Sequence, residues 1–574
     1  MTTKTRSVAV LTLVAGLCAA QAPAPDAQIP PADLVLRNGR VVTVDDRMPE
    51  AQAIAARGGK IVFVGTSADV AKYVGSTTQV IDLAGQFAMP GFIEGHGHFN
   101  NLGEFKLNLD LMTAKSWDEI VHMVALAVER AKPGQWIVGR GWHQDKWSSR
   151  PAPNVDGFPL HASLDKVSPN NPVVLTHASG HASFVNKKAM ELSNITKSTA
   201  NPTGGDILKD KDGNPTGLMN ETAQRLVQRG AGEPQRTPAE AEARAREVRR
   251  LADEELITKG ITSFQDAGSS YDDVDRAKRM IDDGTMRARL WLMLRVLNPE
   301  LEAGVSKYRT IGYGNDMLTV RAIKVTADGA LGSRGAWLLE PYADKPDSSG
   351  LVPPTVRTLP ETARIAIANN MQLCVHAIGD RANREVLNIY EEAFTKAKVN
   401  GKGLRWRIEH AQHISAADIP RFGLLGVIAS MQANHATSDG SWVPDRLGAA
   451  RSEEGAYVWQ KLMKSGAIVS NGTDAPVELV DPILNYYSTV TRKLADGKTF
   501  YPSQAMTRME ALRSYTLMNA YAAFEDDVKG SLSLGKLADI TVLTKDITKV
   551  PDEEIKTAKV AYTIVGGKVV YKGQ

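Results

Sequence analysis

The sequence predicts an α/β protein: a (β/α)8 TIM-like barrel with a large insertion after its first strand, plus a small β domain built from both ends of the chain. Three observations predict this fold class. The chain has 574 residues, enough for a large core domain and an accessory domain. Helical segments alternate with short apolar strands through the middle, which is typical of a parallel sheet or barrel. Segments rich in strands and tight turns lie at both ends.

The two ends share one pattern. An apolar run at residues 33–37 leads into the Asn38-Gly39 turn, and a second run follows at 40–44. Similar runs recur near the C-terminus, at 538–543 and 561–571. We therefore expect residues 33–88 and 528–574 to form the N-terminal and C-terminal parts of one β domain.

The middle of the chain, residues 89–527, contains eight candidate barrel strands. A helix that begins with a capping box at Thr237 and Glu240, with Pro238 in its first turn, precedes one of these strands. Eight strand–helix units suit a TIM barrel, and residues 104–235 are surplus to it, so we expect an insertion there. The predicted strands start at or near Phe92, Ile261, Arg289, Arg321, Gln372, Arg405, Val427 and Ala467.

Composition excludes several classes of protein. Hydrophobic residues make up 43% and charged residues 23%, which argues against disorder, collagen and coiled coil. The formal net charge is only +3, so a nucleic-acid partner is not expected. With two cysteines and eleven histidines, a disulfide framework is impossible, and any metal site must use histidine and carboxylate ligands.

The N-terminus resembles a secretion signal. Lys4 and Arg6 precede an apolar run too short to span a bilayer, and Ala20 and Ala22 offer cleavage positions. We expect residues 1–22 to be a signal peptide and 23–32 a linker, which predicts a periplasmic or secreted protein. A lipid anchor at Cys18 is less favoured because bulky Leu17 precedes it. No other segment is long and apolar enough to span a membrane.

Polar residues at strand ends form a candidate metal site. His96 and His98 follow the first strand, and two imidazoles at this spacing on an extended chain point the same way. Each such residue alone has an ordinary explanation, as a core histidine, a snorkelling lysine or a helix cap. Together they predict a single site, since barrel strands present their functional residues at one edge. The remaining members are Lys324, His376, His410 and Asp474.

These motifs identify a family resemblance that covers nearly the whole chain after the signal. The chain resembles the amidohydrolase superfamily, in particular its YtcJ-like, amidohydrolase-3 branch. The resemblance implies a barrel metal site beside a β-sandwich built from both termini. The matching segments are Met89–His98, Gly260–Gly268, Lys324–Gly329, His376–Arg381, Arg407–Gln412, Thr473–Val477 and Gly535–Asp539.

The resemblance also implies roles. His96, His98 and Asp474 would bind one divalent metal, with Zn²⁺ favoured and other ions open, while His376 and His410 would bind a second. Lys324 would be carboxylated by carbon dioxide and bridge the two ions. Burial depresses a lysine pKa toward the neutral amine that this reaction needs. Asp474 would be the general base for a metal-bound hydroxide. Whether one ion or two are bound stays open.

The predicted substrate pocket draws on the insertion and on two barrel loops. Alternatives stay open for several of its members: His181 could make a structural hydrogen bond, Trp142 could simply pack, and Asp328 or Glu221 could cap turns. The predicted substrate-binding residues are Trp142, Gln144, His181, Asp328 and His435.

The predicted function is hydrolysis of a non-peptide C–N bond, such as that of an N-acyl or N-formyl amine. Two alternatives remain. One is an esterase or lactonase that uses the same site, and the other is a non-catalytic scaffold with an amidohydrolase-like barrel. The expected partner is a small-molecule substrate, and the sequence leaves the oligomeric state open, a homo-oligomer being one option.

Overall fold

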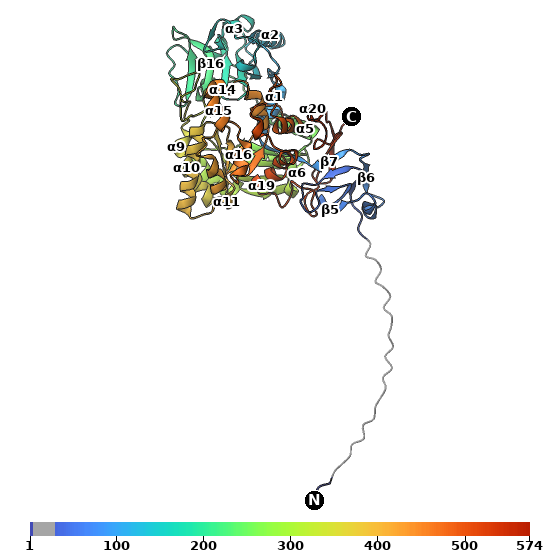
Figure 1. Ribbon diagram of the computed structural model, residues 1–574. Coiled ribbons are helices and arrows are strands. Elements are labelled where there is room, and N and C mark those ends of the chain that lie inside the picture. Colours follow the sequence, from blue (N-terminus) through green and yellow to red (C-terminus); the bar gives the residue numbers. More distant parts are fainter. Residues whose placement is uncertain (4–28, 574) are drawn as a thin grey trace.

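The computed structural model describes residues 1–3 and 29–573. Nearly all of the predicted signal peptide, and Cys18 with it, lies outside the described residues, as does most of the predicted linker. Within the described part of the chain, no helix combines the length and apolar character needed to cross a membrane. Figure 1 shows a central barrel with one group of strands beside it and another above it.

The predicted parallel barrel is confirmed. Its eight strands pair in parallel in chain order, and the first closes on the last through a parallel bridge between Gly97 and Ala475. The sixth strand starts at Arg407 rather than Arg405, because Arg405 adopts a left-handed φ of 49° that ends the preceding helix. The strands are β8 (Phe92–Gly97), β17 (Ile261–Ser269), β18 (Arg289–Leu294), β20 (Leu318–Thr326), β21 (Gln372–Ala377), β22 (Arg407–His410), β23 (Ile428–Met431) and β24 (Val469–Asn471).

Helices surround this barrel and bury their apolar faces against it. The helix before β17 has the predicted capping box, in which Thr237 accepts from the backbone of Glu240 while the Glu240 side chain returns to Thr237. The principal helices are α1 (Phe99–Leu107), α5 (Pro238–Thr258), α6 (Tyr271–Asp282), α7 (Asn298–Tyr308), α9 (Thr355–Ala368), α10 (Asp380–Ala397), α12 (Ile419–Leu425), α13 (Ala433–Asp439), α14 (Val443–Leu447), α15 (Ala449–Gly455), α16 (Trp459–Lys464), α17 (Pro482–Thr491), α18 (Arg508–Ser514) and α19 (Leu517–Ala522).

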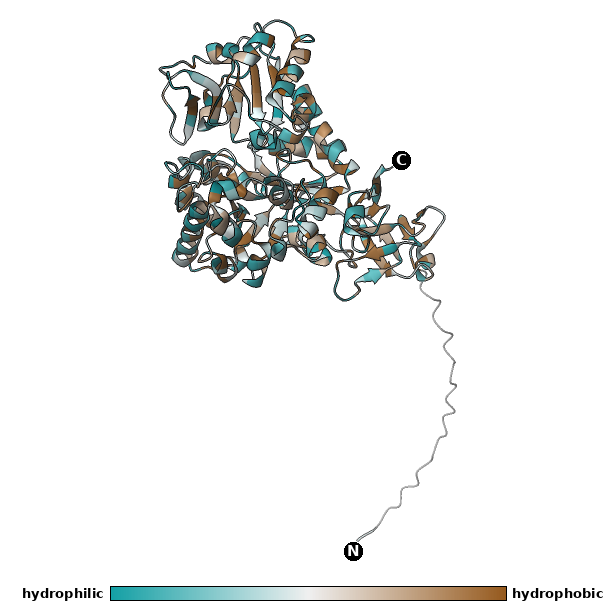
Figure 2. Cartoon of the chain, turned by 45° about the horizontal axis from the view of Figure 1, so that its top comes forward, coloured by the Kyte–Doolittle hydropathy of each residue, from teal (hydrophilic) through white to brown (hydrophobic). Residues whose placement is uncertain are grey.

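Between β8 and β17 the chain forms a separate six-stranded sheet with its own apolar core. This sheet lies at the top of Figure 1, and Figure 2 shows hydrophobic stretches in some of its strands. Its strands are β9 (Leu109–Asp110), β10 (Ile137–Trp142), β13 (Val173–His177), β14 (Ala182–Val185), β15 (Gly205–Lys209) and β16 (Pro215–Glu221), with helices α2 (Trp117–Val128), α3 (Ala162–Val167) and α4 (Lys187–Leu192).

Strands from the two ends of the chain pair with each other. β25 (Ile540–Leu543) lies antiparallel to β7 (Phe87–Pro90), which extends across the predicted boundary at residue 88. A shared apolar core joins the two terminal sheets. One sheet contains β1 (Leu34–Arg37), β4 (Ala53–Arg57), β5 (Lys60–Gly65) and β6 (Gln79–Asp82); the other contains β2 (Arg40–Val42), β3 (Glu50–Ala51), β7, β25, β26 (Val560–Val565) and β27 (Lys568–Lys572). The domain boundaries stay predictions.

Candidate active site

The six predicted metal ligands lie together at the carboxyl ends of the barrel strands. His96 lies near the end of β8, Lys324 lies in β20, and His376 and His410 lie at the ends of β21 and β22. His98 follows β8 directly, and Asp474 follows β24. All except His98 are buried. Parallel strands bring these ends to one edge, so residues far apart in the sequence meet there.

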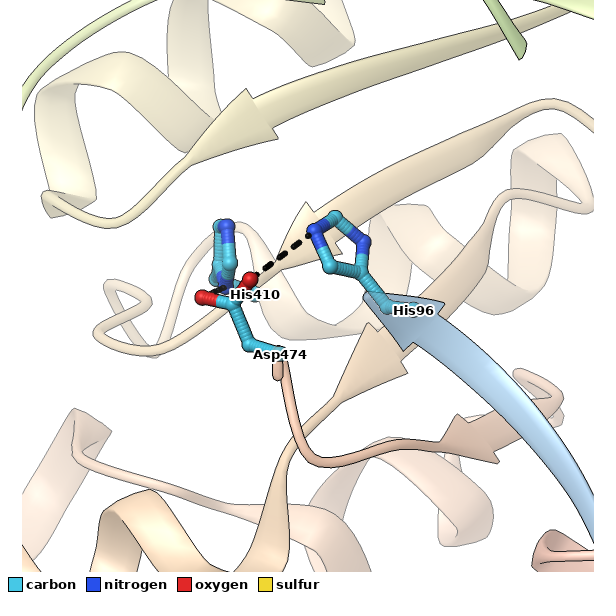
Figure 3. A group of neighbouring side chains, drawn as sticks. All are labelled: His96, His410 and Asp474. Atoms are coloured by element: carbon cyan, nitrogen blue, oxygen red, sulfur yellow. Dashed lines mark ion pairs between the residues drawn. The ribbon is translucent and has the colours of Figure 1, made fainter. Parts of the chain in front are cut away.

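The tightest group consists of His96, His410 and Asp474, drawn in Figure 3. One ligand atom from each can be chosen so that all lie within 4.8 Å of one another. His96 Nε2 lies 3.5 Å from Asp474 Oδ1, and His98 Nε2 lies 3.1 Å from the same oxygen. One carboxylate oxygen of Asp474 therefore lies close to both His96 and His98.

Lys324 and His376 complete the group. The Lys324 Nζ atom lies 3.4 Å from His96 Nε2. The His376 and His410 rings are 4.5 Å apart between centroids. The lysine thus lies beside His96, while His376 and His410 lie close to each other on the next two strands, β21 and β22.

Neighbouring side chains fix the orientation of two imidazoles. Glu409 contacts Nδ1 of His96, and Gln432 Oε1 lies 2.7 Å from Nδ1 of His410. When Nδ1 carries the proton, Nε2 is left as the free lone pair, as metal-bound histidines usually require. Arg407 in turn donates to Glu409 over 3.1 Å. The sequence reasoning missed Glu409 and Gln432; the signal for Glu409 was a carboxylate inside a buried strand, next to a histidine.

The electrostatics favour ligands that carry no positive charge. Burial, followed by the nearby Lys324 charge, lowers the pKa of His96 to about 4. Burial also lowers the pKa values of His376 and His410 well below their usual range, and that of Lys324 to about 8. His96, His376 and His410 are therefore neutral at neutral pH, and the amine of Lys324 is neutral in an appreciable fraction of molecules.

Several buried polar atoms at this site have no hydrogen-bond partner among the described residues. They are Nε2 of His376, Nε2 of His435 and Oδ1 of Asp474. The histidine nitrogens 3.1 and 3.5 Å from Asp474 Oδ1, and the Asp328 oxygen 3.3 Å from His376 Nε2, lie at angles that do not make hydrogen bonds. An unpaired buried polar atom costs roughly 1–3 kcal/mol, so native proteins rarely leave several in one place without a reason. Imidazole nitrogens and a carboxylate facing each other are the donor set of a divalent cation such as Zn²⁺, and the residues present fit one.

A cavity opens next to this group. Two of the predicted substrate contacts, His181 and His435, line it together with His376, His410 and Asp474. Nε2 of His435 lies 4.0 Å from Asp474 Oδ2. The cavity also has lining residues that sequence reasoning did not assign to the pocket, and only packing of the insertion against the barrel shows them. These are Lys146, Asp439 and Glu478.

Trp142 and Gln144 do not line this cavity. The Trp142 ring is buried in the core of the insertion, where its indole N–H donates to the Leu175 carbonyl over 2.8 Å. Gln144 Oε1 lies 3.1 Å from Nε2 of His177. In place of the predicted substrate contacts, the structure therefore gives Trp142 a packing role and Gln144 a supporting one, because their polar groups are already engaged within the insertion.

The side chain of Asp328 is likewise hydrogen-bonded within the protein. Its carboxylate accepts backbone hydrogen bonds from Trp337, Ile378 and Gly379 over 2.8–3.0 Å. Nε2 of His376 lies 3.3 Å from its Oδ1. Burial raises the pKa of Asp328 to about 7, although these bonds oppose the rise. The turn-capping alternative therefore describes Asp328 better than the predicted substrate contact.

Comparisons with known proteins give a consistent result. A family model described as "Amidohydrolase family" matches residues 79–571. Protein LONG AFTER FAR-RED 3 of Arabidopsis thaliana is 32% identical, covering 94% of this chain and 92% of its own. The putative amidohydrolase YtcJ of Bacillus subtilis is 29% identical over 94% of this chain and 99% of its own. N-substituted formamide deformylase of Arthrobacter pascens is 26% identical, covering 94% of this chain and 98% of its own.

The fold comparison agrees. The crystal structure of an uncharacterized metal-dependent hydrolase from Pyrococcus horikoshii has a TM-score of 0.71 and 26% identity, covering 91% of this chain and 99% of its own. The family match spans the barrel that carries the clustered histidines and the C-terminal strands β25 to β27. The chain therefore belongs to the amidohydrolase family and is a metal-dependent hydrolase.

Proposed function

We propose that this enzyme hydrolyses the C–N bond of a non-peptide amide, with an N-acyl or N-formyl amine as substrate. The observation that carries the proposal is the convergence of His96, His98, Lys324, His376, His410 and Asp474, with unpaired buried ligand atoms at their centre. Similarity to a protein named as an N-substituted formamide deformylase supports the C–N class of bond.

We assign His96, His98 and Asp474 to one ion and His376 and His410 to a second, with Zn²⁺ as the ion and Lys324, as its carbamate, between them. A divalent ion held there would lower the pKa of water from 15.7 to about 7 and polarise the acyl carbonyl. Lys324 suits carboxylation because its pKa is lowered to about 8 by burial, so some of its amine is neutral and nucleophilic.

Asp474 moves the proton in this scheme. It takes a proton from the attacking water, whose oxygen bonds to the acyl carbon, and delivers it to the nitrogen as the C–N bond breaks. The products are a carboxylic acid and an amine. Its position supports this role, because it is buried, faces the cavity and lies within 4.0 Å of both His410 and His435.

The test is a hydrolysis screen on purified, metal-analysed enzyme. Matched pairs of N-formyl or N-acyl amines and the corresponding esters are compared, with Asp474→Ala as the blank. We expect amine release from amides, with metal present in the protein. Turnover of the esters alone would replace the proposal with an esterase, and a metal-free protein inert toward both would indicate a scaffold.

We also propose export to the periplasm or medium, on the basis of the charged and apolar pattern of residues 1–22. Cell fractionation and N-terminal sequencing of the mature protein test this. Intact Met1 on cytoplasmic enzyme would contradict it.

A further inference from the structure

One histidine of the insertion, His143, forms part of the cavity wall. It follows β10 directly, and its side chain is buried. Its ring packs against the rings of His177 and Trp442, with centroids 4.5 and 5.6 Å away. Neither neighbour is one of the six proposed metal ligands. The ring is therefore held in the wall beside residues other than those that would act on the scissile bond.

A backbone hydrogen bond fixes which nitrogen of His143 carries the proton. The N–H of Asp145 donates to Nδ1 of His143 over 3.3 Å, and this bond caps the short helix η2 (Gln144–Lys146). A backbone N–H can only donate, so Nδ1 must supply a lone pair. A charged imidazolium has no lone pair, so the ring is neutral and its proton lies on Nε2. Burial lowers the pKa of His143 well below its usual range, which agrees with a neutral ring.

The Nε2–H group of His143 is an unused donor. The one hydrogen bond that the His143 ring makes to the described residues is at Nδ1. Gly332, another residue of the cavity wall, lies beside Nε2: a Cβ atom added to it would be 3.4 Å from this nitrogen. Because glycine has no side chain, the space next to Nε2 stays open. Native proteins rarely leave an N–H in such a place without an acceptor, and a molecule bound in the cavity can supply one.

The neighbouring ring of His177 provides a comparison within the same wall. Its Nδ1 also accepts a backbone N–H, that of Ser179, over 3.1 Å, so its proton too lies on Nε2. That nitrogen lies 3.1 Å from Gln144 Oε1 and donates to it. The N–H of His177 is therefore used inside the protein, whereas that of His143 is available to a ligand.

The charges of the surrounding wall favour an uncharged acceptor. Lys146 is already paired, with its Nζ 3.5 Å from Glu478 Oε1. A second carboxylate, that of Asp439, also lines the cavity and accepts from the Tyr457 hydroxyl over 2.8 Å. Carboxylates thus outnumber amines here, so an anionic group would be repelled. Apolar side chains complete this part of the wall: Ala178, Ala330, Leu331, Trp442 and Val477.

We propose that Nε2–H of His143 donates a hydrogen bond to an uncharged oxygen of the substrate that lies away from the bond being cleaved. His143 would then be a specificity-determining residue. The inference rests on the proposed function, because the cleaved bond is that of the amide. It narrows the substrate class to N-acyl or N-formyl amines whose apolar chain carries a second oxygen, such as an ether, hydroxyl or carbonyl oxygen. A site built to bind such a group discriminates against the analogue that lacks it.

A series of N-formyl alkylamines tests the proposal on metal-loaded enzyme. Each member has one ether oxygen, placed at successive positions along the chain, and is paired with the compound in which CH₂ replaces that oxygen. The readout is the ratio of kcat/KM within each pair. At the position that reaches His143, we expect the wild type to favour the ether about 3- to 10-fold, the effect of one neutral hydrogen bond. Analogues that end in a carboxylate should be poorer than both.

Two variants remove the donor by different routes. His143→Asn keeps an acceptor that can still cap η2 but loses Nε2–H, so the preference for the ether should disappear. Gly332→Ala keeps His143 and places a methyl group beside Nε2, which should reduce the same preference. A purely structural effect would change kcat/KM of both members of a pair alike and leave their ratio unchanged.

Matched controls carry the same substitutions at other places. His161→Asn is the histidine control, because His161 pairs with Asp165 over 2.6 Å but does not line the cavity. Gly403→Ala is the glycine control, since its Cβ would enter open space. Both controls should keep the wild-type ratio.

The outcomes separate this inference from the proposed function. A preference that is lost in His143→Asn, reduced in Gly332→Ala and kept in the controls supports it. The absence of any ether preference in the wild type, a wild-type ratio in either test variant, or a preference for the carboxylate would overturn it while amide hydrolysis still stands. If the wild type cleaves no amide, the proposed function fails and this inference fails with it.

Discussion

At the scale of single residues, two of the clustered ligands have strained backbones. His410 has a φ of 72° and Asp474 a φ of 56°, both in the left-handed region that costs non-glycine residues roughly 1–3 kcal/mol. Successive residues of a regular strand point to opposite faces. The turn at His410 instead lets neighbouring Glu409 and His410 both reach the cluster, one contacting His96 and the other lying near Asp474. The positive φ of His410 therefore lets two consecutive side chains reach the cluster, where a regular strand would present only one of them.

Lys324 gives the first prediction. Replacing it with Met keeps much of its volume but removes the amine that we expect to be carboxylated. Lys324→Met should therefore lose bound metal and nearly all activity. Intact-mass measurement of the wild type should show the added mass of one carbon dioxide, and elemental analysis should show less metal in the variant. Full metal content in Lys324→Met would refute the bridging carbamate.

Asp474 gives the second prediction. Asn at this position keeps the shape and one oxygen but cannot accept the proton. Asp474→Asn should lower kcat about 10²–10⁴-fold, the usual range for losing a general base, while KM changes little. Metal content is measured in parallel, so that loss of a base is distinguished from loss of a ligand. Near wild-type turnover by the metal-loaded variant would show that another group moves the proton.

Residue-level prediction from sequence worked where strand ends alone determine position. Lys324 and His376 lie where their strands predicted, because a barrel collects such ends at one edge. It was less successful for Trp142 and Asp328, whose surroundings depend on how the insertion and the barrel loops pack. The sequence shows that a polar or aromatic side chain is present, but not which neighbouring group it will contact or hydrogen-bond.

At the scale of elements, the eight barrel strands were predictable because each is a short apolar run followed by polar residues. Their pairing also followed, since parallel strands joined by helices pair in chain order. The six-stranded sheet of the insertion was not predicted: it mixes parallel and antiparallel pairs, and a strand such as Leu109–Asp110 has only two residues. Such short strands carry too little pattern to be recognised before their neighbours are known.

The contact between the barrel and the terminal sheets gives the third prediction. Arg289 of β18 binds both carboxylate oxygens of Asp539 at 2.7 and 2.9 Å, and both side chains are buried. Arg289→Met would leave the Asp539 charge buried without its partner. Losing one member of such a pair costs about 3–5 kcal/mol, so the melting temperature should fall clearly.

Arg364→Met is the matched control for this contact, because Arg364 is half exposed and, among the described residues, pairs only with exposed Glu302 and Glu361. Exposed pairs contribute little, so this variant should melt close to the wild type. Differential scanning calorimetry compares the three proteins. Equal melting temperatures for Arg289→Met and the wild type would show that the buried pair does not hold the terminal sheets to the barrel.

At the scale of the whole molecule, the active site draws on the barrel and the insertion, while the terminal sheets support the barrel from the side (Figure 1). The ligands are held mainly by the protein itself, through Glu409, Gln432 and the buried strands around them. We therefore expect the fold to form without the ion, unlike small zinc domains that unfold without metal. Metal binding should nonetheless raise the free energy of unfolding, because an ion that binds only the native state stabilises that state.

Metal removal tests this link. Dialysis against a chelator should abolish hydrolysis while far-UV circular dichroism stays native, and Zn²⁺ should restore activity. Saturating the site at about 1,000 times its Kd would add about 4 kcal/mol to the free energy of unfolding, so the apo enzyme should melt several degrees lower. Asp474→Ala is the control, since its melting temperature should respond much less to Zn²⁺. An equal response would place the ion elsewhere, and full activity after complete metal removal would refute a catalytic metal.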